Sequence, residues 1–341
     1  MIADAKARVR LHIEAAAKLY DEREALLPAL VQSTGLSPEG VRFAWERSYE
    51  RSISESDLET LIAEAAPAAS VLAVLSSNVF VAPVRALACA LARSAHVFVK
   101  PSRREPHLVR ALVRLEPELG MTLLTDAEAS VFQGEVHVYG RKATIDAYRT
   151  SLPASSQLVS HGPGFGVAYV GPDADLDQSA ARIADDIVLF EQRGCLSPRV
   201  TFVEGPTARA SEFARFLVRR LESHPVPRGH VSEEEEAEIR SFARTAEVVG
   251  ELFEGKGVRV AACDTFASPL IAPNGRNMYV ASMAAAEGDP LGSIAPFVTV
   301  LGSDHDVPWR PRGARLAPLG RMQSPPLDGP VDMRGRERVT P

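Results

Sequence analysis

Cys195 stands between a glycine and a Ser-Pro pair in the stretch FEQRGCLSPRV, residues 190–200. The residues after it predict a strand, so the cysteine is expected in a connection where a thiol is accessible and yet held in place. A thiolate is nucleophilic near neutral pH and is also a good leaving group, so a thiol held in this way could take part in covalent catalysis. The sequence therefore offers Cys195 as a candidate nucleophile, with a buried small apolar residue as the alternative.

The composition argues against a disulfide framework, a metal site and a nucleic-acid-binding face. Cys89, inside the apolar ALACALA, and Cys263 are expected in the core, and three distant cysteines argue against a disulfide framework and for a reducing compartment. No CxxC or HExxH spacing occurs, so no metal site is predicted. The net charge is -6 and the arginines are interleaved with acids, which leaves no basic face for nucleic acid.

The length and the amino terminus indicate a folded, cytoplasmic protein. A chain of 341 residues is long enough for two domains, and 45% hydrophobic with 24% charged residues is typical of globular proteins. The first residues mix acids and bases at helical spacing, so they predict neither a secretory signal nor a membrane span.

The elements that must position the candidate residues follow an α/β pattern. In residues 70–102 an apolar run, a helical stretch from about Pro83 to Arg93 and a second apolar run predict a βαβ unit of a parallel sheet. The loops at 76–78 and 100–103 follow the carboxyl ends of the two strands. Open parallel sheets bind ligands at these ends.

The pattern repeats farther along the chain. A strand ending at Tyr139, a glycine turn at Gly140 and a helix from about Lys142 form the next unit. An apolar stripe at helical spacing runs over residues 176–190, and the helix is expected to stop at Gly194. Cys195 therefore falls in a connection from a helix to a strand.

Three regions are expected. A helical segment to about Leu61 leads into a first domain, residues 1–163, and a second domain spans residues 164–302. Residues 303–341 are rich in Pro, Gly and Arg and predict an extended tail that runs over the surface rather than building core.

Four stretches together resemble the aldehyde dehydrogenase superfamily, and within it the LuxC-type acyl-CoA reductases. They are SSNVFVAPVRALACALARSAHVFVKPS, HGPGFGVAYVG, DADLDQSAARIADDIVLFEQRGCLSPRV and PLGRMQSPPLDG. The resemblance covers residues 71–328 and implies an α/β fold with two Rossmann-like parallel-sheet domains, one for the cofactor and one for catalysis. It also implies a nicotinamide cofactor, which this superfamily binds without a GxGxxG motif.

The resemblance assigns roles to individual residues. Cys195 would be the nucleophile that carries the acyl group, and the amide of Asn78 would form an oxyanion hole with the backbone N–H of Cys195. Lys100 falls where the superfamily contacts the adenosine ribose. Ser102 and Gly140, in loops past strand ends, complete the expected cofactor-binding set.

Three departures from the superfamily pattern are informative. Arg103, followed by Arg104, replaces a ribose-binding glutamate, and since guanidinium groups bind phosphate well, NADPH is favoured over NADH. His161, 34 positions before Cys195, replaces the glutamate that activates water in hydrolytic relatives, although a histidine can itself act as a base near neutral pH or simply anchor a turn. Gly292 stands where a glutamate contacts the nicotinamide ribose.

The preferred hypothesis is an NADPH-dependent reductase of acyl-CoA or another acyl thioester. Reduction of acyl phosphates, a catalytically weak structural subunit, and a Cys-His acyl hydrolase or transferase are the alternatives. The resemblance implies a homodimer, with a partner acyl-transfer protein as the further expectation. The chain looks short at its amino-terminal side for the LuxC type, and the acyl chain length is not encoded in any local pattern.

Overall fold

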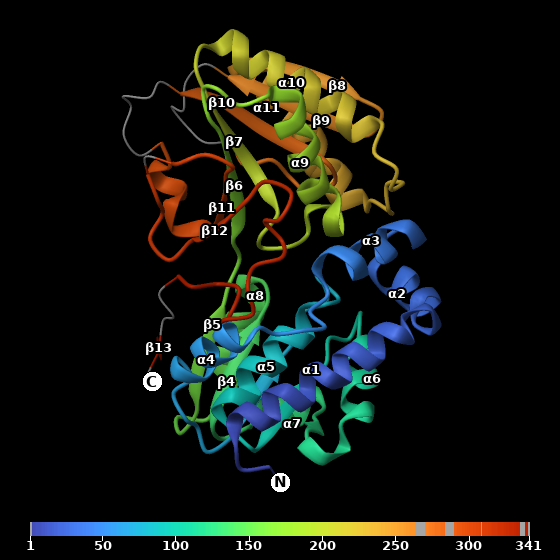
Figure 1. The fold of residues 1–341 in the computed structure, drawn as a ribbon, viewed down its shortest axis with the longest axis vertical. Helices are drawn as coiled ribbons and strands as arrows, with labels where there is room; N and C mark the ends of the chain where they lie inside the picture. Colours follow the sequence, from blue (N-terminus) through green and yellow to red (C-terminus); the bar gives the residue numbers. More distant parts are fainter. Residues whose placement is uncertain (1, 264–269, 284–289, 308, 335–337, 340–341) are drawn as a thin grey trace.

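The computed structural model describes residues 2–263, 270–283, 290–307, 309–334 and 338–339. Within them the chain forms two β-sheets covered by helices, and Figure 1 shows the two units one above the other. The predicted α/β class with two parallel-sheet units is confirmed.

The first sheet, in the lower unit of Figure 1, has the strand order β13-β5-β4-β1-β2-β3. All its pairs are parallel except β13 with β5. Because parallel strands end at the same edge, the loops after β1, β4 and β5 lie together, on the side of the second unit. The strands are β1 (Val71–Val74), β2 (Val97–Lys100), β3 (Thr122–Leu123), β4 (Glu135–Tyr139), β5 (Gln157–His161) and β13 (Arg338–Val339).

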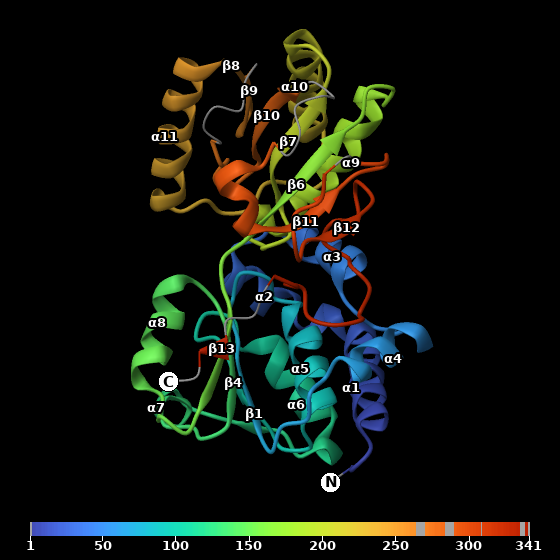
Figure 2. The same cartoon turned by 90° about the vertical axis from the view of Figure 1, so that its left-hand side faces the viewer.

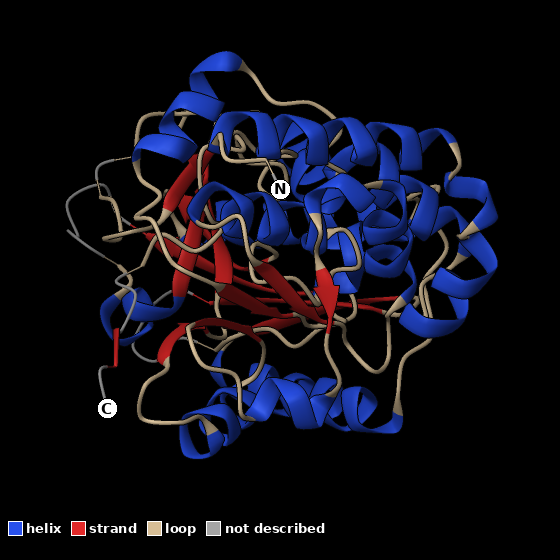
Figure 3. Ribbon diagram, turned by 90° about the horizontal axis from the view of Figure 1, so that it is seen from below, coloured by secondary structure: helices blue, strands red, loops and turns tan. Residues whose placement is uncertain are grey.

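Helices cover both faces of this sheet, as Figure 2 and Figure 3 show. Val71 and Ala73 of β1 belong to the core under α5, whereas Leu72 and Val74 belong to the core under α7 and α8. Two covered faces explain why β1 is an unbroken apolar run. On the first face lie α1 (Ala5–Asp21), α4 (Glu55–Ala63), α5 (Ala82–Arg93) and α6 (His107–Leu115), and on the second lie α7 (Asp126–Ser130) and α8 (Lys142–Ser151).

The second sheet has the order β12-β11-β6-β7-β10-β9-β8, antiparallel only between β8 and β9. Helices α9 (Leu176–Val188) and α10 (Thr207–Glu222) cover one face and α11 (Glu233–Val249) the other. We propose the domain boundary at residues 163 and 164, which falls between β5 and β6. The strands are β6 (Phe165–Val170), β7 (Pro198–Glu204), β8 (Glu251–Gly255), β9 (Val258–Cys263), β10 (Asn277–Met283), β11 (Val298–Gly302) and β12 (Arg315–Ala317).

The amino-terminal helices link the two units. Helix α2 (Leu27–Thr34) ends at Gly35, whose φ of 73° is left-handed, and the side chain of Ser37 caps α3 (Pro38–Ser48). Arg47 of α3 forms an ion pair of 2.8 Å with Asp185 of the second unit. Short 3-10 helices in the described part of the chain lie at Arg23–Ala25, Pro117–Leu119, Leu189–Gln192 and Gly292–Phe297. No helix in the described part of the chain has the length and apolarity to cross a bilayer.

The tail corrects the sequence-based expectation that it runs over the surface. Trp309, Met322 and Leu327 are buried, β12 extends the second sheet and β13 extends the first. Buried Arg85 donates hydrogen bonds of 2.7–2.9 Å to three carbonyl oxygens of residues 325–329. Prolines and glycines remove the periodic pattern, yet their carbonyls still accept hydrogen bonds and neighbouring apolar side chains still pack, so composition alone misled the prediction.

Candidate active site

A cavity of about 260 Å³ opens where the loops after β1, β4 and β5 face the second sheet. It brings together four of the residues that the sequence analysis singled out, namely Asn78, Gly140, His161 and Cys195. The remaining wall comes from α5, from the start of the second unit and from the tail. The cofactor candidates Lys100, Ser102 and Arg103 lie outside this cavity.

The chain reaches Cys195 through a left-handed turn. Helix α9 ends at Val188, not at Gly194 as the sequence analysis expects, because Phe190, Glu191 and Gln192 have left-handed φ values of 54°, 51° and 59°. Such a backbone costs L-residues about 1–2 kcal/mol each. Contacts around the turn must therefore stabilise it.

Two buried polar side chains hold the turn in place. The carboxylate of Glu191 accepts hydrogen bonds of 2.8 and 3.2 Å from Arg276. The side-chain amide of Gln192 donates to the carbonyl oxygen of Asn277 at 2.6 Å and accepts from its backbone N–H at 2.8 Å. These contacts fix the approach to Cys195 from a strand more than 80 residues away.

The loop around Cys195 is fixed by close packing. A Cβ at Gly194 would lie 2.9 Å from Oε1 of Gln323 and 3.2 Å from Val79, so any larger residue here would displace the side chain of Gln323. The hydroxyl of Thr299 in β11 donates to the carbonyl oxygen of Cys195 at 2.5 Å. The sequence analysis missed Thr299 because nothing local links it to the cysteine.

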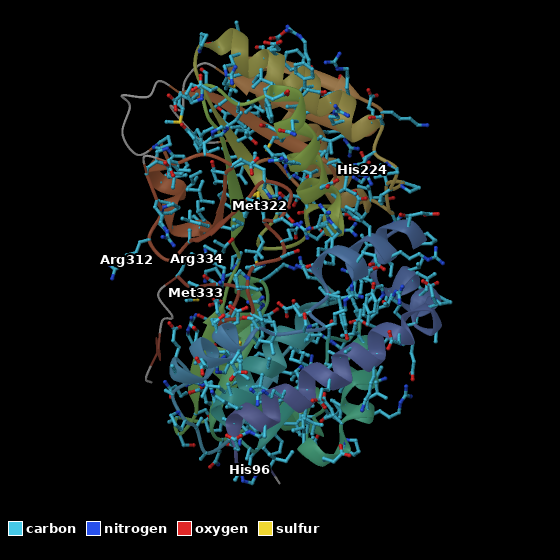
Figure 4. All side chains as sticks on the ribbon, in the orientation of Figure 1. His96, His224, Arg312, Met322, Met333 and Arg334 are labelled. Carbon is cyan, nitrogen blue, oxygen red and sulfur yellow. The ribbon has the colours of Figure 1, made fainter. Side chains whose placement is uncertain are left out.

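The surroundings of the half-buried Cys195 favour the thiol over the thiolate. Burial raises its pKa to about 11, and the nearby carboxylate of Asp332 adds to the increase. Arg334, the backbone N–H of Cys195 and Arg85 act in the opposite direction. Figure 4 labels Arg334 at the level where the two units meet. A reaction of this thiol therefore needs a group that removes its proton.

Asn78 lies in the exposed turn between β1 and α5 and lines the same cavity as Cys195. The turn ends where α5 begins, and Pro83 lies in the first turn of this helix, where the fixed φ of proline is favourable. An amide donor in the same cavity as the thiol is suited to stabilising negative charge on a carbonyl oxygen under attack.

His161 ends β5 at the cavity wall. Its ring stacks on Tyr139 of β4, with centroids 4.1 Å apart and an interplanar angle of 6°. Its Nε2 lies 3.0 Å from Nδ1 of His137. The other nitrogen of His137 lies 2.6 Å from Glu135, which also accepts hydrogen bonds from Arg93.

The sequence analysis missed Glu135 and His137. The alternation in EVHVY is typical of a strand with one polar face toward water, whereas in the fold both faces of β4 are covered and these two residues are buried. Burial by itself would raise the pKa of Glu135, but hydrogen bonds from His137 and Arg93 bring it down to about 2. Glu135 is thus a fixed negative charge behind the cavity.

Lys100, Ser102 and Arg103 follow the carboxyl end of β2. Nζ of Lys100 lies 2.7 Å from the carboxylate of Asp126, which the sequence analysis also missed, and the hydrogen bond lowers the pKa of Asp126. Arg103 is 86% exposed and lies 3.8 Å from the same carboxylate. Together with Arg104 this corner carries a net positive charge.

Gly292 begins a 3-10 helix with a φ of 47°, and a Cβ there would meet no atom within 4 Å. Its position thus offers no carboxylate to a ribose. Across the residues that the structure describes, no three His, Cys, Asp or Glu side chains gather closely enough to hold a metal ion.

Comparisons with known proteins agree with the sequence resemblance. A family model described as acyl-CoA reductase (LuxC) matches residues 55–267, which is more than half of the chain. A search of curated protein sequences gave no significant match.

Solved structures show the same fold at low sequence identity. A putative aldehyde dehydrogenase from Burkholderia cenocepacia is 14% identical with a TM-score of 0.66, covering 88% of this chain and 74% of that one. An oxidoreductase from Marinobacter aquaeolei is 13% identical with a TM-score of 0.64, covering 83% and 69%. An NADP-dependent glyceraldehyde-3-phosphate dehydrogenase from Bacillus halodurans, solved with NADP, is 15% identical with a TM-score of 0.61, covering 88% and 74%. The fold is therefore of the aldehyde dehydrogenase type.

Proposed function

The chain belongs to the acyl-CoA reductase (LuxC) family, and from this premise we propose that it reduces an acyl thioester to an aldehyde through an acyl group carried on Cys195. Family and fold support an aldehyde-forming oxidoreductase. The observation that carries the finer proposal is the single cavity lined by Cys195, Asn78 and His161.

Acyl transfer to Cys195 is the first half of the proposed reaction. The thiol loses its proton to His161, and the sulfur attacks the carbonyl carbon of the thioester. The amide of Asn78 and the backbone N–H of Cys195 stabilise the charge on the carbonyl oxygen, by about 3 kcal/mol for each donor. The bond to the leaving sulfur breaks, and His161 gives the proton to the departing thiolate.

Release of the aldehyde is the second half. When bound, a reduced nicotinamide would supply the hydride that the acyl carbon takes up. The bond from that carbon to Cys195 then breaks, the aldehyde leaves, and the Cys195 thiolate takes a proton from solution. Position 161 carries no water-activating carboxylate, which favours this outcome over hydrolysis to an acid.

The residues at the carboxyl ends of the first sheet fit a nicotinamide dinucleotide. The carboxylate of Asp126 can accept hydrogen bonds from ribose hydroxyls. Helix α8 begins at Lys142, two residues after the cavity-lining Gly140, so its N-terminus suits an anionic group. The positive corner around Lys100 and Arg103 supports NADPH over NADH. A homodimer, expected from the resemblance, stays a prediction.

The test mixes the protein with NADPH and acyl-CoAs of graded length and follows nicotinamide absorbance. Loss of absorbance that requires both the thioester and Cys195 is the expected result. Cys195→Ser should abolish it, and Asn78→Ala should lower kcat by about 100-fold. Cys263→Ala, a substitution at a buried cysteine of the second unit, is the matched control and should keep the activity.

Other results would assign other functions. Release of free CoA with NADPH unchanged would identify a Cys-His hydrolase or transferase. Oxidation of NADPH with an acyl phosphate alone would identify an acyl-phosphate reductase. No reaction from a folded protein with any of these substrates would overturn the reductase and favour a structural subunit.

A further inference from the structure

A line of buried polar side chains leads from the interior of the first unit to His161. It consists of Arg93 from α5, Glu135 and His137 from β4, and His161 from β5. The exposed fractions are 7%, 7%, 4% and 8% in that order. Burying charged and polar groups costs free energy, so a core selected for stability alone would be apolar at these positions.

The strand geometry makes this line possible. Glu135 and His137 are two residues apart on β4 and point to the same face, toward α5. The parallel register pairs Tyr139 with His161, so the imidazole of His161 continues the line on the neighbouring strand and ends it at the wall of the main cavity.

The hydrogen bonds determine which nitrogen of each ring carries a proton. The ionised carboxylate of Glu135 accepts from Nε2–H of His137, 2.6 Å away, since a carboxylate held by Arg93 can only accept. Nδ1 of neutral His137 is then an acceptor, and it accepts from Nε2–H of His161 at 3.0 Å. Neutral His161 consequently has its basic lone pair on Nδ1.

We propose that Glu135 and His137 are positioning residues that hold His161 in the tautomer able to take the Cys195 proton and return it to the departing thiolate. This rests on the proposed reductase function. When Nδ1 of His161 receives the proton, the proton on Nε2 shifts toward His137, and the positive charge then lies beside the Glu135 carboxylate. The reverse shift delivers one proton to the leaving sulfur, so no proton is gained or lost in acyl transfer.

Other charged and titratable groups surround the two histidines. Besides Cys195 and Arg93, the neighbours that share cavity walls with them are Glu64, Arg85, Cys89, Tyr139, Arg141, Arg193, Arg199 and Asp332. Because so many groups titrate there, a pH profile alone does not isolate the relay. A comparison of two thioesters with different leaving groups isolates it.

The experiment measures single-turnover acylation of Cys195 without nicotinamide, using an acyl-CoA and the matching nitrothiophenyl thioester. The nitrothiophenolate leaves without needing a proton, whereas the CoA thiolate is helped by one. His137→Gln should slow acylation by acyl-CoA about 100-fold, and the loss with the nitrothiophenyl thioester should be about tenfold smaller. Equal losses with both thioesters would overturn the relay and leave a purely structural role.

A second variant, His137→Asn, keeps the relay testable if His137→Gln does not fold. His137→Asn keeps an acceptor at the position of Nδ1, so it should lose less activity than His137→Gln and show the same difference between thioesters. His96→Gln is the control, because His96 is exposed and lies at the far end of the first unit in Figure 4. If the unmodified protein is not acylated by either thioester, the proposed function itself fails.

Discussion

At the scale of single residues, the chemistry depends on the charges around one thiol. Cys195 lies between Asp332, which disfavours its thiolate, and Arg334 and Arg85, which favour it. Asp332 and Arg334 also form an ion pair of 2.7 Å with each other. Burial has the largest effect on the pKa of this thiol, and the tail supplies two of the charges that modify it.

Asp332→Asn should lower the pKa of Cys195, because it removes a negative charge and leaves Arg334 unpaired nearby. Alkylation of Cys195 by iodoacetamide, quantified by peptide mass spectrometry, should be roughly three- to tenfold faster at pH 8. Asp328→Asn changes another carboxylate of the tail, paired with Arg315, and should leave the rate unchanged. Equal rates for Asp332→Asn and the unmodified protein would contradict this account.

Arg103→Glu should reverse the cofactor preference, because a carboxylate repels a 2′-phosphate while it accepts bonds from ribose hydroxyls. NADPH affinity, titrated by nicotinamide fluorescence, should fall roughly tenfold or more, and NADH affinity should not fall. Arg110→Glu, at an exposed position of α6, controls for overall charge. The same loss for both cofactors would argue against a phosphate contact at Arg103.

At the scale of elements, the left-handed turn before Cys195 is the feature that needs the most support. Its backbone cost is offset only while Glu191 and Gln192 keep their buried partners. Those partners lie on the segment leading into β10, so the position of the nucleophile depends on correct assembly of the second sheet.

Glu191→Gln should destabilise the fold by about 3 kcal/mol, because it leaves Arg276 buried without its counter-charge. Urea unfolding followed by circular dichroism measures the change. Glu254→Gln breaks a pair with Arg259 in which the carboxylate is exposed and the arginine partly buried, and it should cost less than about 1 kcal/mol. Losses of the same size in the two variants would show that the Glu191 pair does not support the turn.

At the scale of the whole molecule, the tail joins the two units around the cavity. Arg85 of the first unit holds its carbonyl oxygens, and Asp186 of the second unit accepts hydrogen bonds from the backbone N–H groups of Gly320 and Met322 at 2.7 and 3.0 Å. The contacts that hold the tail at the wall of the cavity therefore also stabilise the fold.

Asp186 predicts a pH dependence of stability. Burial raises its pKa to about 8, against the effect of the two backbone hydrogen bonds. The folded chain then binds this proton more tightly than the unfolded chain, so this group stabilises the fold at low pH and its contribution falls as pH rises from 3.8 to about 8.

Asp186→Asn cannot titrate, so its free energy of unfolding relative to the unmodified protein should rise between about pH 5 and about pH 9. Urea titrations at each pH measure this difference. Asp177→Asn, on the same helix but with an exposed side chain and a lowered pKa, should show no such trend. A constant difference for Asp186→Asn would mean that the carboxyl is already ionised at pH 5.

The sequence by itself determined the α/β class, the βαβ unit of the first sheet and the place of Cys195 between a helix and a strand. These follow from local periodicity and from residue types at strand ends, which every stretch carries within itself. Lys100, Ser102 and Arg103 remain predictions of the same local kind.

Only the tertiary structure decided the surroundings of the thiol. EVHVY alternates as a half-exposed strand would, and the packing of α5 over it is what buries Glu135 and His137. The tail has no periodic pattern, and the arginines that bind its carbonyls are distant in sequence. Contacts of this kind depend on sheet register and on how the two units meet, and no local stretch of sequence specifies either.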